Sequence, residues 1–307
     1  MHYIQKAKDI GLKGTIASLK RIAHKKYYHL TAWVRCYPKY QNPTPSDLNK
    51  IEAALVSNDV STIDYRVEVT DFNAFHAEYL FGDQFYCGKS YIYTEKVLEH
   101  YIAYDLGLRK MPQGGHYIDI AACNSPWVKL LREKGYKADA IDLEPSKFYS
   151  GLPYYHVMDA TQTDFEAHSV DLVSLQCAFE MFLNKDDIEL IRELGRILKP
   201  NGMAVICPLY MHIEYCGYCS AEYWHRKNFH DQGAKLYVSM NSYSVPFSRK
   251  YDCKTLRERV LATALENGMD YKIYILRNGA AIDPQVYCYF ILVLQKKGPK
   301  DDRAHMP

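Results

Sequence analysis

The chain has 307 residues, of which 48% are hydrophobic and 24% charged, as expected of a folded globular protein with a sizeable core. Its formal net charge of +2 excludes a global basic field, which disfavours nucleic acid as a partner. No apolar run approaches the roughly 20 residues of a membrane span. The first residues lack the apolar core of a secretion signal, and nine cysteines, an odd number, suit reduced thiols, so we expect a cytoplasmic protein.

Residues 1–90 are expected to form a mainly helical N-terminal extension that acts as a lid or as a dimer arm. Residues 10–28 have the period of an amphipathic helix, with apolar residues on one face and many lysines elsewhere. This basic helix could be a solvated face, or it could contact a polyanion or a membrane surface. Further helices are expected at about 46–57 and 70–80. The sequence leaves open whether the protein is a monomer or a homodimer.

Residues 91–300 alternate apolar strands with amphipathic helices. Strands that alternate with helices predict a parallel sheet with helices on both faces. The last two β-rich runs are joined by a loop too short for a helix, so we expect them to pair antiparallel. We therefore predict an α/β, Rossmann-like sheet of seven strands, mostly parallel with an antiparallel last strand, interrupted by a long aromatic and irregular insertion at 208–250 and followed by a tail at 301–307. The strands are expected at 117–121, 138–142, 154–158, 170–175, 203–207, 271–277 and 287–295, with helices at 93–107, 125–134, 186–198 and 254–266.

The most informative motif is a buried strand, a turn of small residues, a helix, and a second strand that ends in an acid. Asp142 lies about twenty residues past Asp119, close to the spacing at which a carboxylate meets ribose hydroxyls in nucleoside-binding sheets. The turn has Ala121, Cys123 and Ser125 where a glycine pattern is usual. Left-handed backbone disfavours alanine and cysteine, so cofactor affinity is less assured than the fold.

The order of these elements resembles the class I S-adenosylmethionine-dependent methyltransferases over about residues 90–297. The resemblance is strongest at 169–175, SVDLVSL, and at 189–206, ELIRELGRILKPNGMAVI, which look like the family's fourth strand, the next helix and the turn into its fifth strand. The terminal β-hairpin is also similar. The resemblance implies S-adenosyl-L-methionine as the cofactor.

The resemblance also implies roles for residues at the carboxyl edge of the sheet. Asp119 would lie near the ammonium of the methionine moiety or near the backbone of the turn, and Asp142 would bind the ribose hydroxyls. Leu143 would lie under the adenine, whose amino group Asp159 would meet. Each of these acids could instead have a structural role, such as capping a turn. The other implied cofactor-binding residues are Ala121, Ala122, Cys123, Asn124 and Ser125 in the turn, Ala160, and Gln176 and Cys177 facing the transferable methyl group.

A hydroxyl acceptor needs a general base, and histidine or a carboxylate serves near neutral pH. The candidates with the best placement in the resemblance are His212 and His230, with Glu180 as an orienting carboxylate. Glu214, His225 and Asp231 are further candidates, and the aromatic residues of 208–250 could close over a substrate.

Two metal sites are conceivable in the insertion. Cys216 and Cys219 with His225 suggest zinc, but a single CxxC pair is weak evidence. His225, His230 and Asp231 could bind a divalent ion that polarises a diol. Neither pattern is specific enough for us to assign a metal.

The function expected from these residues is O-methylation of a sugar, a glycan or another small polyhydroxyl or natural-product metabolite, by direct in-line transfer. Two alternatives stay open. The missing glycines suggest a catalytically lapsed methyltransferase fold that serves as a binding or scaffold protein. The basic helix suggests an RNA methyltransferase.

Overall fold

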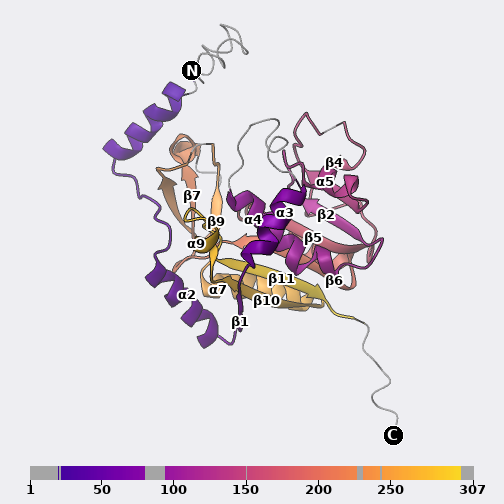
Figure 1. Ribbon diagram of the computed structural model, residues 1–307. Coiled ribbons are helices and arrows are strands. Elements are labelled where there is room, and N and C mark those ends of the chain that lie inside the picture. Colours follow the sequence, from indigo (N-terminus) through magenta and orange to yellow (C-terminus); the bar gives the residue numbers. More distant parts are fainter. Residues whose placement is uncertain are drawn as a thin grey trace.

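The computed structural model describes residues 20, 22–79, 94–149, 151–226, 231–242 and 244–298. Figure 1 shows a large sheet with helices on both of its faces and a smaller group of strands beside it. Within these residues the large sheet has eight strands in the order β1-β10-β11-β6-β5-β2-β3-β4, and the small sheet has the order β8-β7-β9. The fold is therefore the mixed α/β, mostly parallel Rossmann-like architecture expected from the sequence.

The strands of the large sheet pair in parallel except β11, which is antiparallel to both β10 and β6. This confirms the antiparallel pairing expected for the last two strands. The sheet is one strand larger than predicted because β1, a four-residue strand at the edge, pairs with β10. Its sequence, TIDY, is too short and too polar to show a strand pattern. The bounds are β1 Thr62–Tyr65, β2 His116–Ile120, β3 Lys137–Asp142, β4 Tyr155–Val157, β5 Val170–Gln176, β6 Leu198–Leu209, β10 Met269–Leu276 and β11 Phe290–Lys296.

Two layers of helices cover the sheet, so its central strands are buried on both sides. Successive side chains of a strand point to opposite faces. Ile118 and Ile120 of β2 belong to the buried cluster that includes residues of α2, α6 and the helix after residue 253, whereas Tyr117 belongs to the cluster that includes residues of α3, α4 and α5. None of the helices in the described part of the chain has the length and hydropathy that a membrane span requires. The bounds are α2 Pro45–Ser57, α3 Val69–Tyr79, α4 Thr94–Leu106, η1 Leu108–Lys110, α5 Trp127–Glu133, η2 Phe179–Met181, α6 Asp186–Ile197, α7 Cys253–Thr255, η4 Leu256–Leu261, α8 Ala262–Glu266 and α9 Gly279–Ile282.

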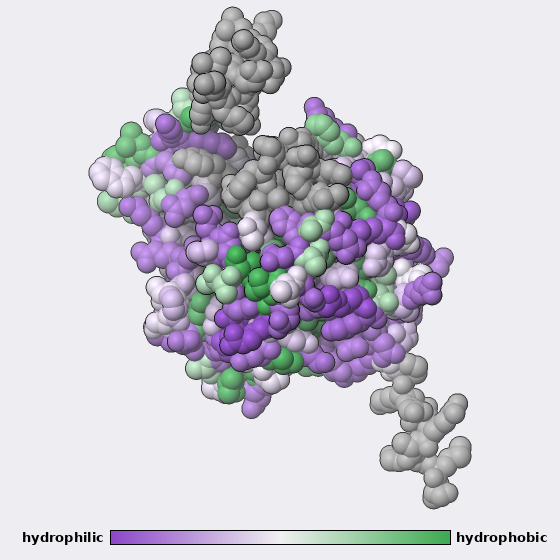
Figure 2. Space-filling view, in the orientation of Figure 1, coloured by the Kyte–Doolittle hydropathy of each residue, from purple (hydrophilic) through white to green (hydrophobic). Residues whose placement is uncertain are grey.

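Residues 22–34 form a helix that projects beside the small sheet (Figure 1). It is held by Ala32, which is buried with Ala221 and Val238. Much of its apolar surface is exposed, including Ile22 and Leu30, and Figure 2 shows hydrophobic residues at this end of the molecule. The first half of the predicted basic helix lies outside the described residues.

The small sheet occupies the segment that the sequence suggested was irregular. It consists of β7 Cys216–Ser220, β8 Lys235–Ser239 and β9 Ser248–Lys250, with the short helix η3 Ala221–Arg226 between β7 and β8. The strand β7 is parallel to β8 and antiparallel to β9. Four of the five residues of β7 are buried, so the strand lacks the polar and apolar alternation that marks a half-exposed strand. The prediction of an irregular insertion was wrong for this reason.

Candidate active site

The turn after β2 has the left-handed backbone that a glycine would adopt more easily. Ala121 has a φ of 57° and Cys123 a φ of 46°. Asp142, at the end of β3, fixes this turn, because its Oδ2 accepts a hydrogen bond from the Cys123 amide at 2.9 Å. Its Oδ1 accepts one from the Glu144 amide at 2.7 Å. Glycine would adopt this backbone conformation without strain. Here the charged hydrogen bonds of the Asp142 carboxylate hold the turn in that conformation instead.

The strain in this turn predicts the effect of restoring a glycine. Left-handed backbone costs an L-residue about 1–2 kcal/mol, and Ala121 is in that region. Ala121→Gly is therefore expected to raise the free energy of unfolding by about 0.5–1 kcal/mol, after the entropic cost of glycine is included. Urea denaturation measures the change. The neighbouring Ala122, which does not have a positive φ, is the matched control, and Ala122→Gly should destabilise the protein. If the two substitutions changed the free energy of unfolding equally, Ala121 would not be strained.

Asp142 also lines a cavity of about 440 Å³ between β3, β4 and the segment after β5, here called the β3–β4 cavity. Leu143 lines the same cavity and is 68% exposed, so its apolar surface is available to a ligand. Asp159 and Ala160 complete one side of it. Asp159 accepts hydrogen bonds from the amide and hydroxyl of Thr161 through its Oδ1, at 2.8 and 2.7 Å. The structure thus brings together Asp142, Leu143 and Asp159, which the resemblance assigns to the ribose and adenine, with Ala160, a further implied cofactor-binding residue.

The other side of the turn borders a cavity of about 290 Å³, the α4 cavity, lined by residues 121–125, Asp119 and Gln176. Asp119 is buried, and its Oδ2 has no hydrogen-bond partner among the described residues. Burial raises the pKa of this carboxyl well above its usual range, and the charge of Asp142 raises it further. An unpartnered acidic oxygen at a cavity wall suits a ligand that brings a cationic donor.

The helix α4 contributes charged residues to this cavity that the sequence analysis did not identify. Lys96 and Glu99 line it and form an ion pair, with the Lys96 Nζ at 2.8 Å from the Glu99 Oε2. Burial alone would lower the pKa of Lys96, but the Glu99 carboxylate outweighs it and the net shift is upward. Glu95 accepts the amides of Tyr287 and Cys288 at 3.0 and 3.1 Å, which holds the segment before β11. In the sequence, these two residues could have been noticed as carboxylates at 95 and 99 that lie beside the apolar positions of this helix.

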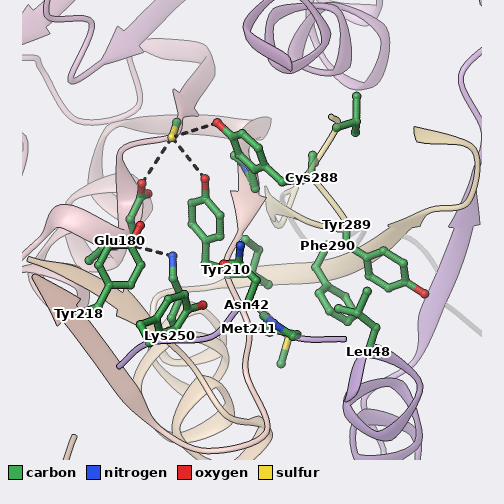
Figure 3. A pocket seen from close by; sticks show the side chains of 18 of the residues that line it. Asn42, Leu48, Glu180, Tyr210, Met211, Tyr218, Lys250, Cys288, Tyr289 and Phe290 are labelled. Atoms are coloured by element: carbon green, nitrogen blue, oxygen red, sulfur yellow. Dashed lines mark hydrogen bonds between the residues drawn. The ribbon is translucent and has the colours of Figure 1, made fainter. Parts of the chain in front are cut away.

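The third and largest cavity, about 750 Å³, is the tyrosine cavity, so called because Tyr40, Tyr210, Tyr218, Tyr287 and Tyr289 line it. Figure 3 shows side chains from the N-terminal segment, from β6, β7 and β9, and from the segment leading into β11 directed toward this space. The N-terminal extension therefore supplies part of its wall.

Cys177 lines all three cavities. It follows β5 with a φ of 51°, and its Sγ lies 3.4 Å from the Tyr210 hydroxyl and 3.5 Å from the Glu180 Oε1 (Figure 3). Burial raises the pKa of the thiol to about 12, and the Glu180 charge adds to this shift. The thiol is therefore neutral near pH 7 and marks the junction of the cavities without acting as a nucleophile.

The predicted acid and base residues differ in whether they line one of the three cavities. Glu180 lines the tyrosine cavity, as expected of an orienting carboxylate. His212 lines none of the three cavities and contacts Tyr40 and the Glu214 amide, so the structure does not support it as the base. His230 lies outside the described residues. Asp231 is buried in an ion pair with Arg249, which makes it structural.

The two suggested metal sites are not assembled in the described part of the chain. No group of three histidine, cysteine or acidic side chains there could hold an ion. Cys216 and Cys219 are three positions apart on β7, so they point to opposite faces of the strand. His225 is exposed and contacts Tyr37.

The strand order defines a Rossmann-like α/β domain, with an acid-anchored turn after β2. Residues 118–206, from β2 into β6, match the family model described as a methyltransferase domain. The chain therefore contains a methyltransferase domain at these residues.

Solved structures with similar folds are distant. The chain shares 15% identity with a methyltransferase from Haloferax volcanii in complex with the Trm112 methyltransferase activator, covering 78% of this chain and 100% of that one, with a TM-score of 0.41. It shares 11% with the 1,6-didemethyltoxoflavin-N1-methyltransferase of Burkholderia thailandensis, covering 78% and 95%, with a TM-score of 0.45. A methyltransferase from Methanosarcina mazei is 13% identical over 62% and 97%, with a TM-score of 0.40. No curated protein matches the chain.

Proposed function

We propose that this protein transfers a methyl group from S-adenosyl-L-methionine to an oxygen of a small polyhydroxyl acceptor bound in the tyrosine cavity. The observation that supports the proposal most is that Cys177 lines all three cavities. When bound, the cofactor supplies an electrophilic methyl group on a sulfonium. With its adenosyl part on one side of the turn and its methionine part on the other, the methyl group would face the third cavity.

The residues present fit this cofactor. In the β3–β4 cavity, Asp142 would accept hydrogen bonds from the ribose hydroxyls, since each of its oxygens accepts one hydrogen bond from the described residues and a carboxylate offers about four lone-pair sites. Leu143, Asp159 and Ala160 would bind the adenine. In the α4 cavity, the unpartnered oxygen of Asp119 would accept the methionine ammonium. The chain's contribution to catalysis is then proximity, exclusion of water and a route for the acceptor's proton.

Calorimetry with S-adenosylhomocysteine, followed by assays with radiolabelled cofactor on panels of sugars and phenols, tests the proposal. We expect binding in the micromolar range and labelled product from one panel. A protein that binds S-adenosylhomocysteine but labels neither panel would contradict O-methylation of such acceptors. A protein that does not bind it would contradict the cofactor assignment as well.

One observation favours a second candidate, a lapsed enzyme that serves as a scaffold. The turn reaches its shape with Ala121 and Cys123 at positive φ, which costs stability that glycines would not. The same calorimetry separates the candidates, because a scaffold with a closed site would not bind S-adenosylhomocysteine. The location in the cell also stays a proposal, and we propose the cytoplasm because of the cysteine usage.

A further inference from the structure

Lys250 is a buried lysine directed into the tyrosine cavity, and no role was assigned to it from the sequence. It lies at the end of β9 and is only 3% exposed. Its Nζ donates a hydrogen bond to the Ser248 Oγ at 3.0 Å and lies 3.4 Å from the centroid of the Tyr210 ring (Figure 3). Among the described residues no carboxylate lies within ion-pair distance of it. A buried amine with one hydrogen bond has donor capacity for a ligand.

Glu180 lies on another wall of the same cavity. It is also buried, at 6% exposure, and belongs to η2. Its Oε1 contacts the Cys177 thiol, whereas its Oε2 has no hydrogen-bond partner among the described residues. A buried carboxylate oxygen without a donor costs free energy that a bound hydroxyl would recover. The cavity thus presents an acceptor at Glu180 and a donor or base at Lys250.

We propose that Lys250 is the general base of the transfer and that Glu180 accepts a hydrogen bond from a second hydroxyl of the same acceptor molecule. The acceptor is then a flat phenolic ring with two hydroxyl groups. This inference rests on the proposed function and names the substrate class within it. From the sequence, the base was expected among histidines and carboxylates, and sugars were the first acceptor class.

Two features favour a phenol over a sugar. Burial lowers the pKa of Lys250 to about 8, although the Glu180 charge raises it. A phenolic hydroxyl has a pKa of about 10 and can pass its proton to such an amine at modest cost, which an aliphatic hydroxyl, being a much weaker acid, cannot. The walls are also aromatic, with the Tyr210 and Tyr287 rings at an interplanar angle of 19° and their centroids 6.1 Å apart. Flat rings stack well on such surfaces.

The proposed step transfers one proton to Lys250 and one methyl group to the acceptor oxygen. The proton of the acceptor hydroxyl moves to the lone pair of the Lys250 Nζ. An oxygen lone pair forms the O–CH₃ bond while the C–S bond breaks and its electron pair stays on sulfur. The products are the methyl ether, S-adenosylhomocysteine and a Lys250 ammonium, which releases its proton to solvent before the next turnover.

The other polar groups near Lys250 do not provide an alternative base. Tyr218 of β7 presents its ring at 5.1 Å from the Nζ, and burial raises the pKa of its hydroxyl. Burial also raises the pKa of the thiols of Cys177 and Cys216, so both are already protonated near pH 7 and cannot accept the proton of a phenol. Among the described residues, the groups that face Lys250 are Glu180 from η2, Cys177 after β5, Tyr210 after β6, Cys216 and Tyr218 from β7, and Ser248 from β9 itself.

The test uses 4-nitrocatechol, whose visible absorption distinguishes phenol from phenolate, with full-length protein saturated with S-adenosylhomocysteine. We expect the ammonium of Lys250 to stabilise the bound phenolate and to lower the probe's apparent pKa by about one unit or more relative to buffer. In Lys250→Met this downward shift should disappear and the probe should bind at least tenfold more weakly. 2-Methoxy-4-nitrophenol, which lacks the second hydroxyl, should bind wild-type protein about tenfold more weakly than 4-nitrocatechol, a difference that Glu180→Leu should abolish.

Calorimetry of both variants with S-adenosylhomocysteine is the control, because neither side chain lines the β3–β4 or α4 cavity. Unchanged affinity shows that the variants are folded. An unshifted probe pKa in wild-type protein, or the same shift in Lys250→Met, would overturn the role of Lys250. If the probe does not bind while S-adenosylhomocysteine does and sugars are methylated, the phenolic class is wrong and the proposed function stands.

Discussion

Arg249→Met is expected to lower the free energy of unfolding by about 3–5 kcal/mol, because it leaves buried carboxylates without their cation. The Arg249 side chain is fully buried and forms ion pairs with Asp231 and Asp187, whose side chains are at most 1% exposed. Its Nη2 also donates to the Asn184 carbonyl at 3.0 Å. Asp187 keeps Arg259 at 2.6 Å, so the larger loss falls on Asp231. Urea denaturation measures the change.

Lys254→Met is the matched control. Lys254 pairs with Glu258 at 3.9 Å, and the two side chains are 78% and 63% exposed. Exposed pairs contribute about 0–1 kcal/mol, so the same substitution there should have little effect. A similar small change in both variants would show that the buried network is not important for stability.

This network also explains how Lys250 reaches the tyrosine cavity. Adjacent residues on a strand point to opposite faces. Arg249 points into the ion-pair network that joins β9 to the start of α6, so Lys250 must point to the other side, where the cavity lies. Because Arg249 and Lys250 are neighbours on the short strand β9, the ion-pair network that fixes Arg249 also fixes the position of the proposed base.

The sequence predicted seven of the eight strands of the large sheet and placed the turn after β2 beside the acid at the end of β3. Strands buried on both faces, such as Phe290–Lys296, give continuous apolar runs, and the helices between them have a clear period. The carboxyl ends of parallel strands meet at one edge, so a motif at the end of β2 and an acid at the end of β3 necessarily lie together. This is why Asp142 could be placed beside the turn at Ala121 without coordinates.

The acceptor side could not be predicted in the same way. Ser248–Lys250 contains two adjacent basic residues, which in sequence indicate an exposed segment, yet both cations are buried. Their burial is tolerable because of their partners, which come from the residue after β6 and from β7, η2 and α6, far away in the sequence. The wall formed by Tyr40 likewise depends on where the N-terminal segment crosses the small sheet, as at the bridge between Lys39 and Val238. No local pattern contains such contacts.

Asp142→Asn is expected to weaken the binding of S-adenosylhomocysteine by about 100-fold. Both carboxylate oxygens now accept hydrogen bonds, from the amides of Cys123 and Glu144. Asparagine keeps only one accepting oxygen, and its NH₂ group cannot accept the second of these bonds. The substitution also removes the charge proposed to bind the ribose hydroxyls. Hydrogen bonds to charged groups contribute about 1.5–3 kcal/mol each, and about 2.7 kcal/mol corresponds to a factor of 100. Calorimetry measures the dissociation constant directly.

The control lies on the same strand. Asp139 of β3 bonds to His116 at 2.6 Å and lines none of the three cavities, so Asp139→Asn makes the same chemical change away from the proposed cofactor. It should leave the dissociation constant for S-adenosylhomocysteine within about threefold of wild type, even if stability falls, because about 0.7 kcal/mol separates such values. If Asp142→Asn also stays within that range while the protein remains folded, the cofactor does not depend on this carboxylate. The turn at Ala121 would then have a structural role alone, and the three cavities would need another ligand.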